Sequence, residues 1–163
     1  MKQITLILIL CLSVVNAQNY SIKHFEDVTK LITAKDGTVY IVGTQSFCEF
    51  RGREQFDNCV LTDEKITNAY IIKDSEFYLV LGSKVVKYVE YKEVGEVDFG
   101  EVITNITFYN NSVIVGTAGS GFYSYSFDQA SLIQYTDRSF INAIIINKGF
   151  LNVLTDTWMY IYN

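Results

Sequence analysis

The residues best suited to bind a ligand in this chain are acidic, and they recur in the connections between its apolar segments. They are Asp27, Asp63, Asp98, Asp137 and Asp156, some of them next to a second acid. Carboxylates that converge without balancing lysines bind a hard cation such as Ca²⁺, or a basic ligand, through their oxygen atoms. In the alternative interpretation, each acid caps a turn by accepting backbone hydrogen bonds. The Asp-x-Asp-x-Asp-Gly spacing of a calcium loop does not occur, so we expect no cofactor and keep Ca²⁺ only as an alternative ligand.

Patterns of catalytic residues are absent from the sequence. No Gly-x-Ser-x-Gly motif occurs, and His24 is the only residue that could act as an imidazole base. A hydrolase that works with two carboxylates needs them about 5–10 Å apart, with the pKa of one raised. Asp63 and Asp98 would be the acids of such an enzyme, which stays as the alternative to a non-enzymatic binding protein.

Aromatic side chains are the other candidates for ligand contacts, since they make up 15% of the chain. Tyr123, Tyr125 and Phe127 alternate with two serines, so in a strand the three rings would share one face. Exposed rings of this kind stack on sugars, whereas buried ones form core. We expect these three to be core.

The N-terminal 17 residues have the pattern of a secretory signal peptide. Lys2 supplies the positive start, residues 4–15 form an apolar run, and Val15-Asn16-Ala17 fits a small-residue cleavage site before Gln18. That run is shorter than the roughly 20 residues that a membrane span needs, although an uncleaved anchor is the alternative. We therefore expect a secreted protein with one domain over residues 18–163 and no membrane span after cleavage.

The cysteines agree with secretion. Cys11 would leave with the signal peptide, so Cys48 and Cys59 remain as an even pair. In a secreted chain such a pair predicts a disulfide, with two buried free thiols as the alternative. These two cysteines and His24 do not form a zinc or copper ligand set. The net charge of −5 and the pI near 4.8 do not suit nucleic acid, which binds clustered lysines and arginines.

Three sequons predict N-glycosylation of a secreted chain. They begin at Asn19, Asn105 and Asn110. Asn110 lies in a predicted tight turn and is the best acceptor, because a glycan must stay in water. Asn105 begins a predicted inner strand, which makes it a poor one.

A fourfold repeat organises these residues. An apolar strand, a polar turn and a second apolar strand end on a small residue at Gly43, Gly82, Gly116 and Thr155, with spacings of 39, 34 and 39. Repeats near this length are typical of propellers and arrays. The second strand of each pair is apolar without alternation, which predicts burial on both sheet faces. The turns carry Asp, Asn, Ser, Lys and Gly, which tolerate the positive φ of tight hairpins.

Each repeat contains four predicted strands. In the third copy they cover residues 105–109, 112–115, 121–127 and 130–135. The last copy has three, and residues 20–25 form an extra segment that would complete it. The sequence therefore predicts an all-β fold: a small propeller of about four four-stranded blades, closed by its N- and C-terminal strands, or else a partial propeller.

Residues 113–125 read Val-Ile-Val-Gly-Thr-Ala-Gly-Ser-Gly-Phe-Tyr-Ser-Tyr. They resemble the repeat of two-component-regulator-type and quinoprotein-like β-propellers, in which an apolar strand ends in Gly-Thr and a glycine leads into an apolar-Tyr strand. Gly43-Thr44 and Gly82-Ser83 begin in the same way, whereas Thr155-Asp156 departs from the pattern. The cysteine pair is faintly similar to that of semaphorin-type propellers, which are several times larger.

Together these observations predict a secreted, non-enzymatic β-propeller that binds a protein, a glycan or a cation at an acidic channel mouth. Such repeats serve many unrelated functions, so the resemblance does not identify the ligand. The chain would act as a monomer or as a homodimer that completes a larger ring. The remaining alternative is a fragment of a larger extracellular propeller.

Overall fold

A computed structural model describes residues 27–50, 56–73, 75–135 and 139–162 of the chain. The predicted signal peptide, the predicted closing segment 20–25, Asn19 and Asp137 lie outside these ranges. The described residues form fifteen strands and no helix, and none of their elements is a helix able to cross a membrane. The strands make four antiparallel sheets, as the repeat predicts.

Each sheet is one repeat, and we call the sheets blades 1 to 4. Blade 1 contains β1 (Val28–Thr33), β2 (Val39–Gly43), β3 (Ser46–Phe50) and β4 (Phe56–Leu61). Blade 2 contains β5 (Ile66–Lys73), β6 (Glu76–Leu81), β7 (Lys84–Val89) and β8 (Lys92–Asp98). Blade 3 contains β9 (Ile103–Tyr109), β10 (Ser112–Thr117), β11 (Phe122–Ser126) and β12 (Ser131–Gln134). Blade 4 contains β13 (Ile141–Asn147), β14 (Phe150–Thr155) and β15 (Met159–Tyr162).

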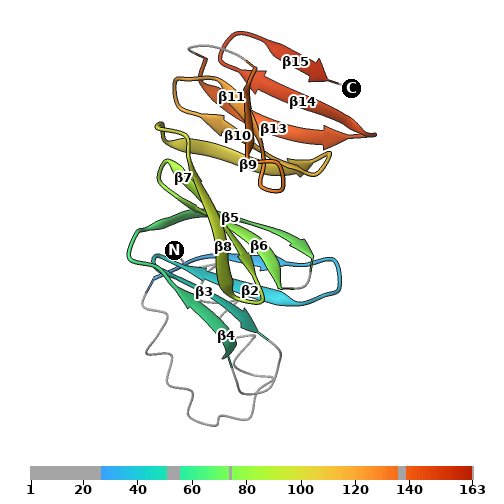
Figure 1. Cartoon of the computed structure of the whole chain (residues 1–163). Coiled ribbons are helices and arrows are strands. Elements are labelled where there is room, and N and C mark those ends of the chain that lie inside the picture. The colour runs from blue at the N-terminus through green and yellow to red at the C-terminus, as the bar shows by residue number, and fades with distance from the viewer. Residues whose placement is uncertain (1–26, 51–55, 74, 136–138, 163) are drawn as a thin grey trace, which may run out of the picture.

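The blades follow one another along the molecule as an open row. Figure 1 shows blade 1 and blade 4 at opposite ends, with blades 2 and 3 between them. The first strands of consecutive blades, β5, β9 and β13, lie side by side. The four sheets confirm the small all-β propeller, and the described residues do not show a closed ring. Closure by residues 20–25 stays a prediction.

Turn chemistry matches the predicted hairpins. Gly37, Ser75, Asn110 and Lys148 all have positive φ between the first and second strands of their blades. Glycine enters this region without steric cost, and the left-handed conformation is enriched in asparagine. These polar turns therefore reverse the chain between the first and second strands of all four blades.

Three apolar clusters hold the row together, and each lies between two neighbouring blades. Phe77 stacks on Phe47 of blade 1 with ring centroids 4.3 Å apart, and Tyr78 stacks on Phe127 of blade 3 at 5.4 Å. Within the described ranges no cluster joins blade 4 to blade 1. Tyr123, Tyr125 and Phe127 belong to the cluster between blades 2 and 3, which confirms that they are core.

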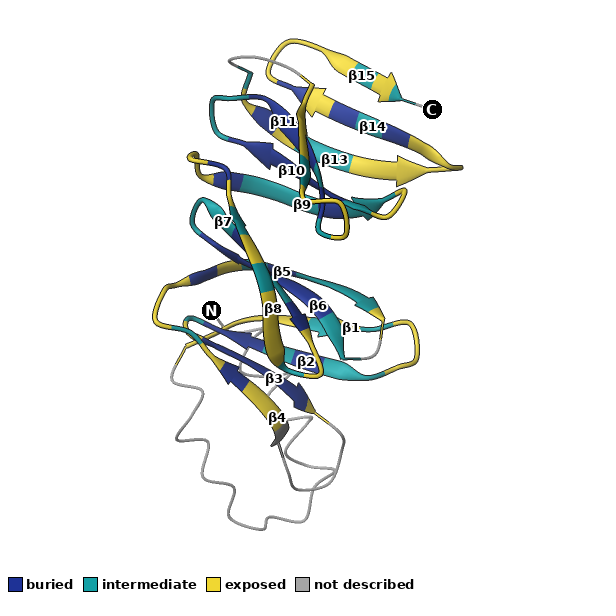
Figure 2. Cartoon of the chain, in the orientation of Figure 1, coloured by how far each residue is buried: buried dark blue, intermediate teal, exposed yellow. Residues whose placement is uncertain are grey.

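The apolar second strands behave as predicted in the middle of the row. Residues 77–81 of β6 and 113–117 of β10 are buried without interruption. In β14 buried residues alternate with exposed or half-buried ones, because among the described residues only one face of blade 4 has a neighbouring blade. Unbroken burial was therefore the wrong prediction for blade 4 (Figure 2). It was also wrong for blade 1, where buried and half-buried residues alternate over residues 39–42 of β2.

The repeat length differs from the one predicted. An irregularity near the start of each first strand aligns Val28, Ile66, Ile103 and Ile141, so the true spacings are 38, 37 and 38 residues. The predicted spacings were wrong because they treated Gly82 and Gly116 as equivalent positions, although the two glycines have different structural roles. Gly82 has a φ of 62° in a turn, whereas a Cβ on Gly116 would lie 2.5 Å from the Ile141 side chain.

A disulfide joins Cys48 to Cys59, as predicted. The two residues are direct partners in the pairing of β3 with β4. The bond therefore links the third strand of blade 1 to its outermost strand.

Candidate functional site at the acidic end

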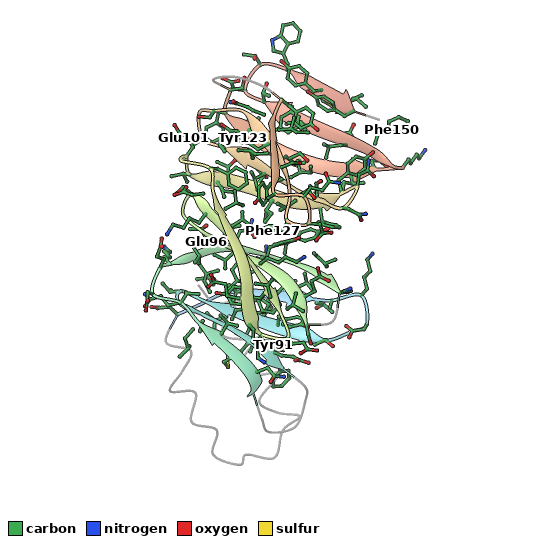
Figure 3. The ribbon with its side chains drawn as sticks, in the orientation of Figure 1. Tyr91, Glu96, Glu101, Tyr123, Phe127 and Phe150 are labelled. Carbon is green, nitrogen blue, oxygen red and sulfur yellow. A yellow bond between two sulfur atoms is a disulfide. The ribbon has the colours of Figure 1, made fainter. Side chains whose placement is uncertain are left out.

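Antiparallel topology brings most of the predicted binding residues to one end of the blades. The connections between blades and the turns between second and third strands all lie at this end, which we call the acidic end. Its described carboxylates are Asp27, Asp63, Glu64, Asp98, Glu101 and Asp156, all of them exposed. In Figure 3, Glu101 marks this edge of the molecule and Phe150 marks the opposite edge. Asp137 lies outside the described residues.

Asp98 caps a turn. Its Oδ1 accepts a hydrogen bond of 2.8 Å from the backbone N–H of Gly100. This hydrogen bond, together with those from Ser83 and the charge of Lys84, lowers the pKa of the Asp98 carboxyl. The turn-cap interpretation therefore describes Asp98, and it does not by itself remove the residue from a binding surface.

Lysine balances part of the acidic end. Lys84 Nζ lies 2.9 Å from Glu64 Oε1, and this hydrogen bond raises the pKa of the lysine. The expectation that no lysine accompanies these carboxylates is thus wrong at blade 2. Among the described residues of this end, Lys65 and Lys84 are the only basic side chains, so the net charge there is strongly negative.

A shallow cleft of about 220 Å³ opens beside this ion pair. Asp63, Glu64, Glu93 and Glu96 line it around Lys84, and its apolar wall includes Val86. The cleft uses the outer strand β8 as well as the connection between blades 1 and 2. The glutamates of β8 were not among the predicted binding residues, because the repeat pattern drew attention to connections only.

The structure does not gather the predicted acids into a metal site. No group of three carboxylate, cysteine or histidine side chains suited to a metal ion occurs in the described ranges. Asp27, Asp63, Asp98 and Asp156 come from connections in different parts of the row, so they spread their charge along one edge. Such an edge suits an extended basic surface better than a single cation.

A groove at the opposite end was not predicted from the sequence. It has a volume of about 530 Å³ between β1 and β5, with Lys30, Lys35 and Lys73 among its lining residues. Lys35 and Lys73 occupy the same position of successive repeats, next to the first turn, and Lys148 occupies it in the fourth. That recurrence was the available signal. Lys30 Nζ donates to Asn68 Oδ1 at 3.1 Å, and Lys73 pairs with Glu76 at 3.1 Å.

A buried carboxylate also escaped notice. Glu49 is buried in β3 and accepts hydrogen bonds from the Tyr91 hydroxyl and from Asn58 Nδ2. Burial and the adjacent Glu49 carboxylate both raise the pKa of Tyr91, which keeps its hydroxyl a donor. Because Tyr91 belongs to blade 2 (Figure 3), this contact ties blades 1 and 2 together.

The predicted glycosylation sites differ in their surroundings. Asn110 is exposed in the turn between β9 and β10, with φ of 48°. Asn105 lies inside β9, and its Nδ2 donates a 3.0 Å hydrogen bond to the Ile141 carbonyl. Since a glycan would be joined through that nitrogen, the packing favours Asn110 over Asn105. Asn19 lies outside the described residues.

Comparison with known proteins supports the fold alone. No family model and no curated protein matches the chain. The extracellular domain of the putative hybrid two component system BT4673 from B. thetaiotaomicron is similar over 90% of this chain and 21% of its own, with 14% identity and a TM-score of 0.66. The C-terminal WD40 domain of Sif2 is similar over 81% and 44%, with 12% identity and a TM-score of 0.65.

These similar structures are β-propeller domains. The chain has the β-propeller fold. A computationally designed protein, Ika4, is similar over 91% of the chain and 98% of its own length, with 14% identity and a TM-score of 0.66. By contrast, this propeller chain spans about a fifth of the BT4673 domain and less than half of the Sif2 domain. The resemblance of residues 113–125 to propeller repeats is thus confirmed at the level of fold.

Proposed function

We propose that this protein is a secreted, non-enzymatic propeller that binds a basic protein surface at its acidic end. The observation that carries the proposal is the set of exposed carboxylates along one edge of the row, with two lysines among them. The extracellular domain among the similar structures and the Cys48–Cys59 disulfide support an extracellular location. Charge on one edge steers an oppositely charged partner and orients it.

The spread of the carboxylates favours a protein over the other predicted ligands. A single cation needs several oxygen ligands within one coordination sphere, and the described acids do not form such a group. A neutral glycan would need exposed aromatic platforms. Tyr123 and its neighbours are packed between blades, which leaves the exposed Trp158 as a single ring near Asp156. A lysine- and arginine-rich surface matches separated carboxylates.

The pKa of Asp98 limits the role that this residue could take in the alternative hydrolase, which needs one carboxyl as general acid and the other as nucleophile or base. A general acid needs a raised pKa, whereas the pKa of Asp98 is lowered by the Gly100 N–H and its other neighbours. Asp98 is therefore poorly suited to protonate a leaving group.

The proposal is tested with a fluorescent octalysine peptide as the probe. The double substitution Asp63→Asn and Asp156→Asn removes two exposed charges from the acidic end. At about 0.5 kcal/mol for each, we expect roughly fivefold weaker binding at low salt. The matched control, Glu90→Gln with Asp128→Asn, removes two exposed charges from the other end and should change binding by less than about twofold. Equal losses in both double variants would reduce the effect to net charge and contradict the proposal.

A further inference from the structure

One apolar side chain at the start of each blade inserts into the preceding blade. Ile66, Ile103 and Ile141 hold this position, and their exposed fractions are 2%, 5% and 0%. The N–H groups of Ile66 and Ile103 also donate to carbonyls of the preceding blade, at 2.7 and 3.0 Å. Val28 holds the same position in blade 1, yet 49% of it is exposed. Val28 therefore holds the position of an inserting residue, but the described residues include no preceding blade to receive it.

The receiving position on the preceding blade shows the same contrast. In blades 1 to 3 it is occupied by Val42, Val80 and Gly116, which are all buried. A Cβ on Gly116 would meet Ile141 at 2.5 Å, which shows how directly the inserted side chain covers this position. Leu154 holds it in blade 4 and is 45% exposed.

The surroundings of these two residues are apolar as well. The face of blade 4 that carries Leu154, which we call the onward face, also exposes Ile145, Met159 and Ile161. Met159 replaces three fully buried residues of the other blades, Phe47, Val85 and Phe122. The face of blade 1 that carries Val28, which we call the backward face, also exposes Leu31 and Leu61. Figure 2 shows the exposed residues of β14 and β15 in yellow.

We propose that the onward face of blade 4 packs on the backward face of blade 1 in a second copy of this chain. The contact repeats, between two chains, the blade-to-blade contact that each chain already makes three times. Burying both faces removes exposed apolar area from water, which is the main favourable contribution to protein association. The two faces of one chain do not meet, because blades 1 and 4 lie at opposite ends of the row (Figure 1).

Two copies close the assembly. A head-to-tail contact between different faces yields a ring if the rotation closes, and an open filament if it does not. The chain spans 44% of the Sif2 WD40 domain and 54% of the AfRom2 CNH domain, so two arcs of this length are about the size of such a domain. The ring has eight blades, one twofold axis and two identical interfaces. It also places both acidic ends on the same side, which doubles the charged surface offered to one partner.

Sedimentation equilibrium of the purified chain tests this assembly. The unaltered chain should have the mass of a dimer at micromolar concentration, and Leu154→Asp or Val28→Asp should convert it to a monomer, raising the dissociation constant at least a hundredfold. The matched control is Leu132→Asp, since Leu132 is 49% exposed on the outer strand of blade 3 and belongs to neither terminal face. If the unaltered chain is a monomer, the proposal is overturned. This holds both if the N-terminal residues of the same chain cover the two faces and if the faces stay uncovered. An open-ended series of masses would overturn the ring.

A mixing experiment separates head-to-tail packing from contact between two like faces. Val28→Asp leaves the onward face intact, and Leu154→Asp leaves the backward face intact. A mixture of the two variants can therefore form one sound interface, so we expect dimers in the mixture at concentrations where each variant alone is a monomer. If blade 4 paired with blade 4 instead, Val28→Asp alone would remain dimeric, and that result would overturn the head-to-tail arrangement. Near-ultraviolet circular dichroism checks that each variant is folded.

Discussion

The two middle blades and the two terminal blades of this propeller are built from one repeat but differ in what covers them. In blades 2 and 3 the second strand is buried along its length. In blade 4 the equivalent strand alternates, and in blade 1 the inserting residue Val28 is half exposed. The apolar character of these strands is therefore a property of the repeat, whereas their burial depends on a neighbour. The outward faces of blades 1 and 4 are apolar like the faces that pack between blades, although no described residues of a neighbouring blade cover them.

The largest expected difference between the two regions is at the inserting position. Ile103→Ala should reduce the free energy of unfolding by about 3 kcal/mol, because it empties a fully packed site between blades 2 and 3. Val28→Ala should reduce the free energy of unfolding of the dissociated monomer by less than about 0.5 kcal/mol, because the Val28 side chain already contacts water there. Urea unfolding at submicromolar concentration measures both. Similar losses would show that Val28 is packed within its own chain.

The disulfide gives blade 1 a support that blade 4 lacks among its described residues. Replacing Cys48 and Cys59 together by alanine should reduce the free energy of unfolding by about 2–3 kcal/mol, since the bond closes an 11-residue separation. Amide exchange resolved by strand should quicken most in β3 and β4. Exchange that quickens equally in β14 and β15 would show that the bond does not act locally on blade 1.

A repeated threonine offers a finer comparison. Thr104 Oγ1 donates to the Gly116 carbonyl of its own blade at 3.2 Å and to the Ile141 carbonyl of blade 4 at 2.8 Å. Among the described residues, Thr29 Oγ1 donates within blade 1 alone, to the Val42 carbonyl at 3.1 Å. Thr104→Val should therefore reduce the free energy of unfolding by about 1 kcal/mol, and Thr29→Val by about half of that. The matched pair is compared by chemical unfolding, and a larger loss for Thr29→Val would contradict the account.

The smallest effect concerns pH. Burial would raise the pKa of Glu76, but Lys73 and Lys87, with nitrogens 3.1 and 3.3 Å away, together lower it. A carboxyl whose pKa is lower in the folded state stabilises the protein above its unfolded pKa, and this contribution is lost as pH falls through the folded pKa. The difference in unfolding free energy between the unaltered chain and Glu76→Gln should be at most about 1 kcal/mol at pH 7 and should shrink between about pH 5 and 3. Glu90→Gln serves as the control for an exposed carboxylate, and a difference independent of pH would contradict the assignment to Glu76.

Most of the fold could be predicted because it depends on patterns of residues that are close together in the sequence. The turns at Gly37 and Asn110, the strands of the third repeat and the Cys48–Cys59 pair each depend on residues close in sequence. The repeat register could not be predicted from glycines, because Gly82 serves a turn and Gly116 serves a contact with Ile141. That distinction depends on tertiary packing.

The candidate site was predicted less completely. Topology brings Asp63, Asp98 and Asp156 to one end, as strand order alone requires. Strand order does not determine side-chain positions. It therefore could not predict the Lys84–Glu64 ion pair or that Glu96 lines the cleft. Two lysines of the groove at the other end, Lys35 and Lys73, left a signal in the repeat, since Lys148 shares their position in blade 4.

One measurement tests most directly whether the terminal faces are halves of one interface. In the double variant Val28→Cys with Leu154→Cys, oxidation should produce a covalent dimer joined by two bonds, seen by mass under denaturing, non-reducing conditions. The control variant Val28→Cys with Leu132→Cys should give little of it. A bond formed within a single chain would mean that four blades close on themselves, and no bond at all would mean that the two faces do not meet; either result would contradict the account.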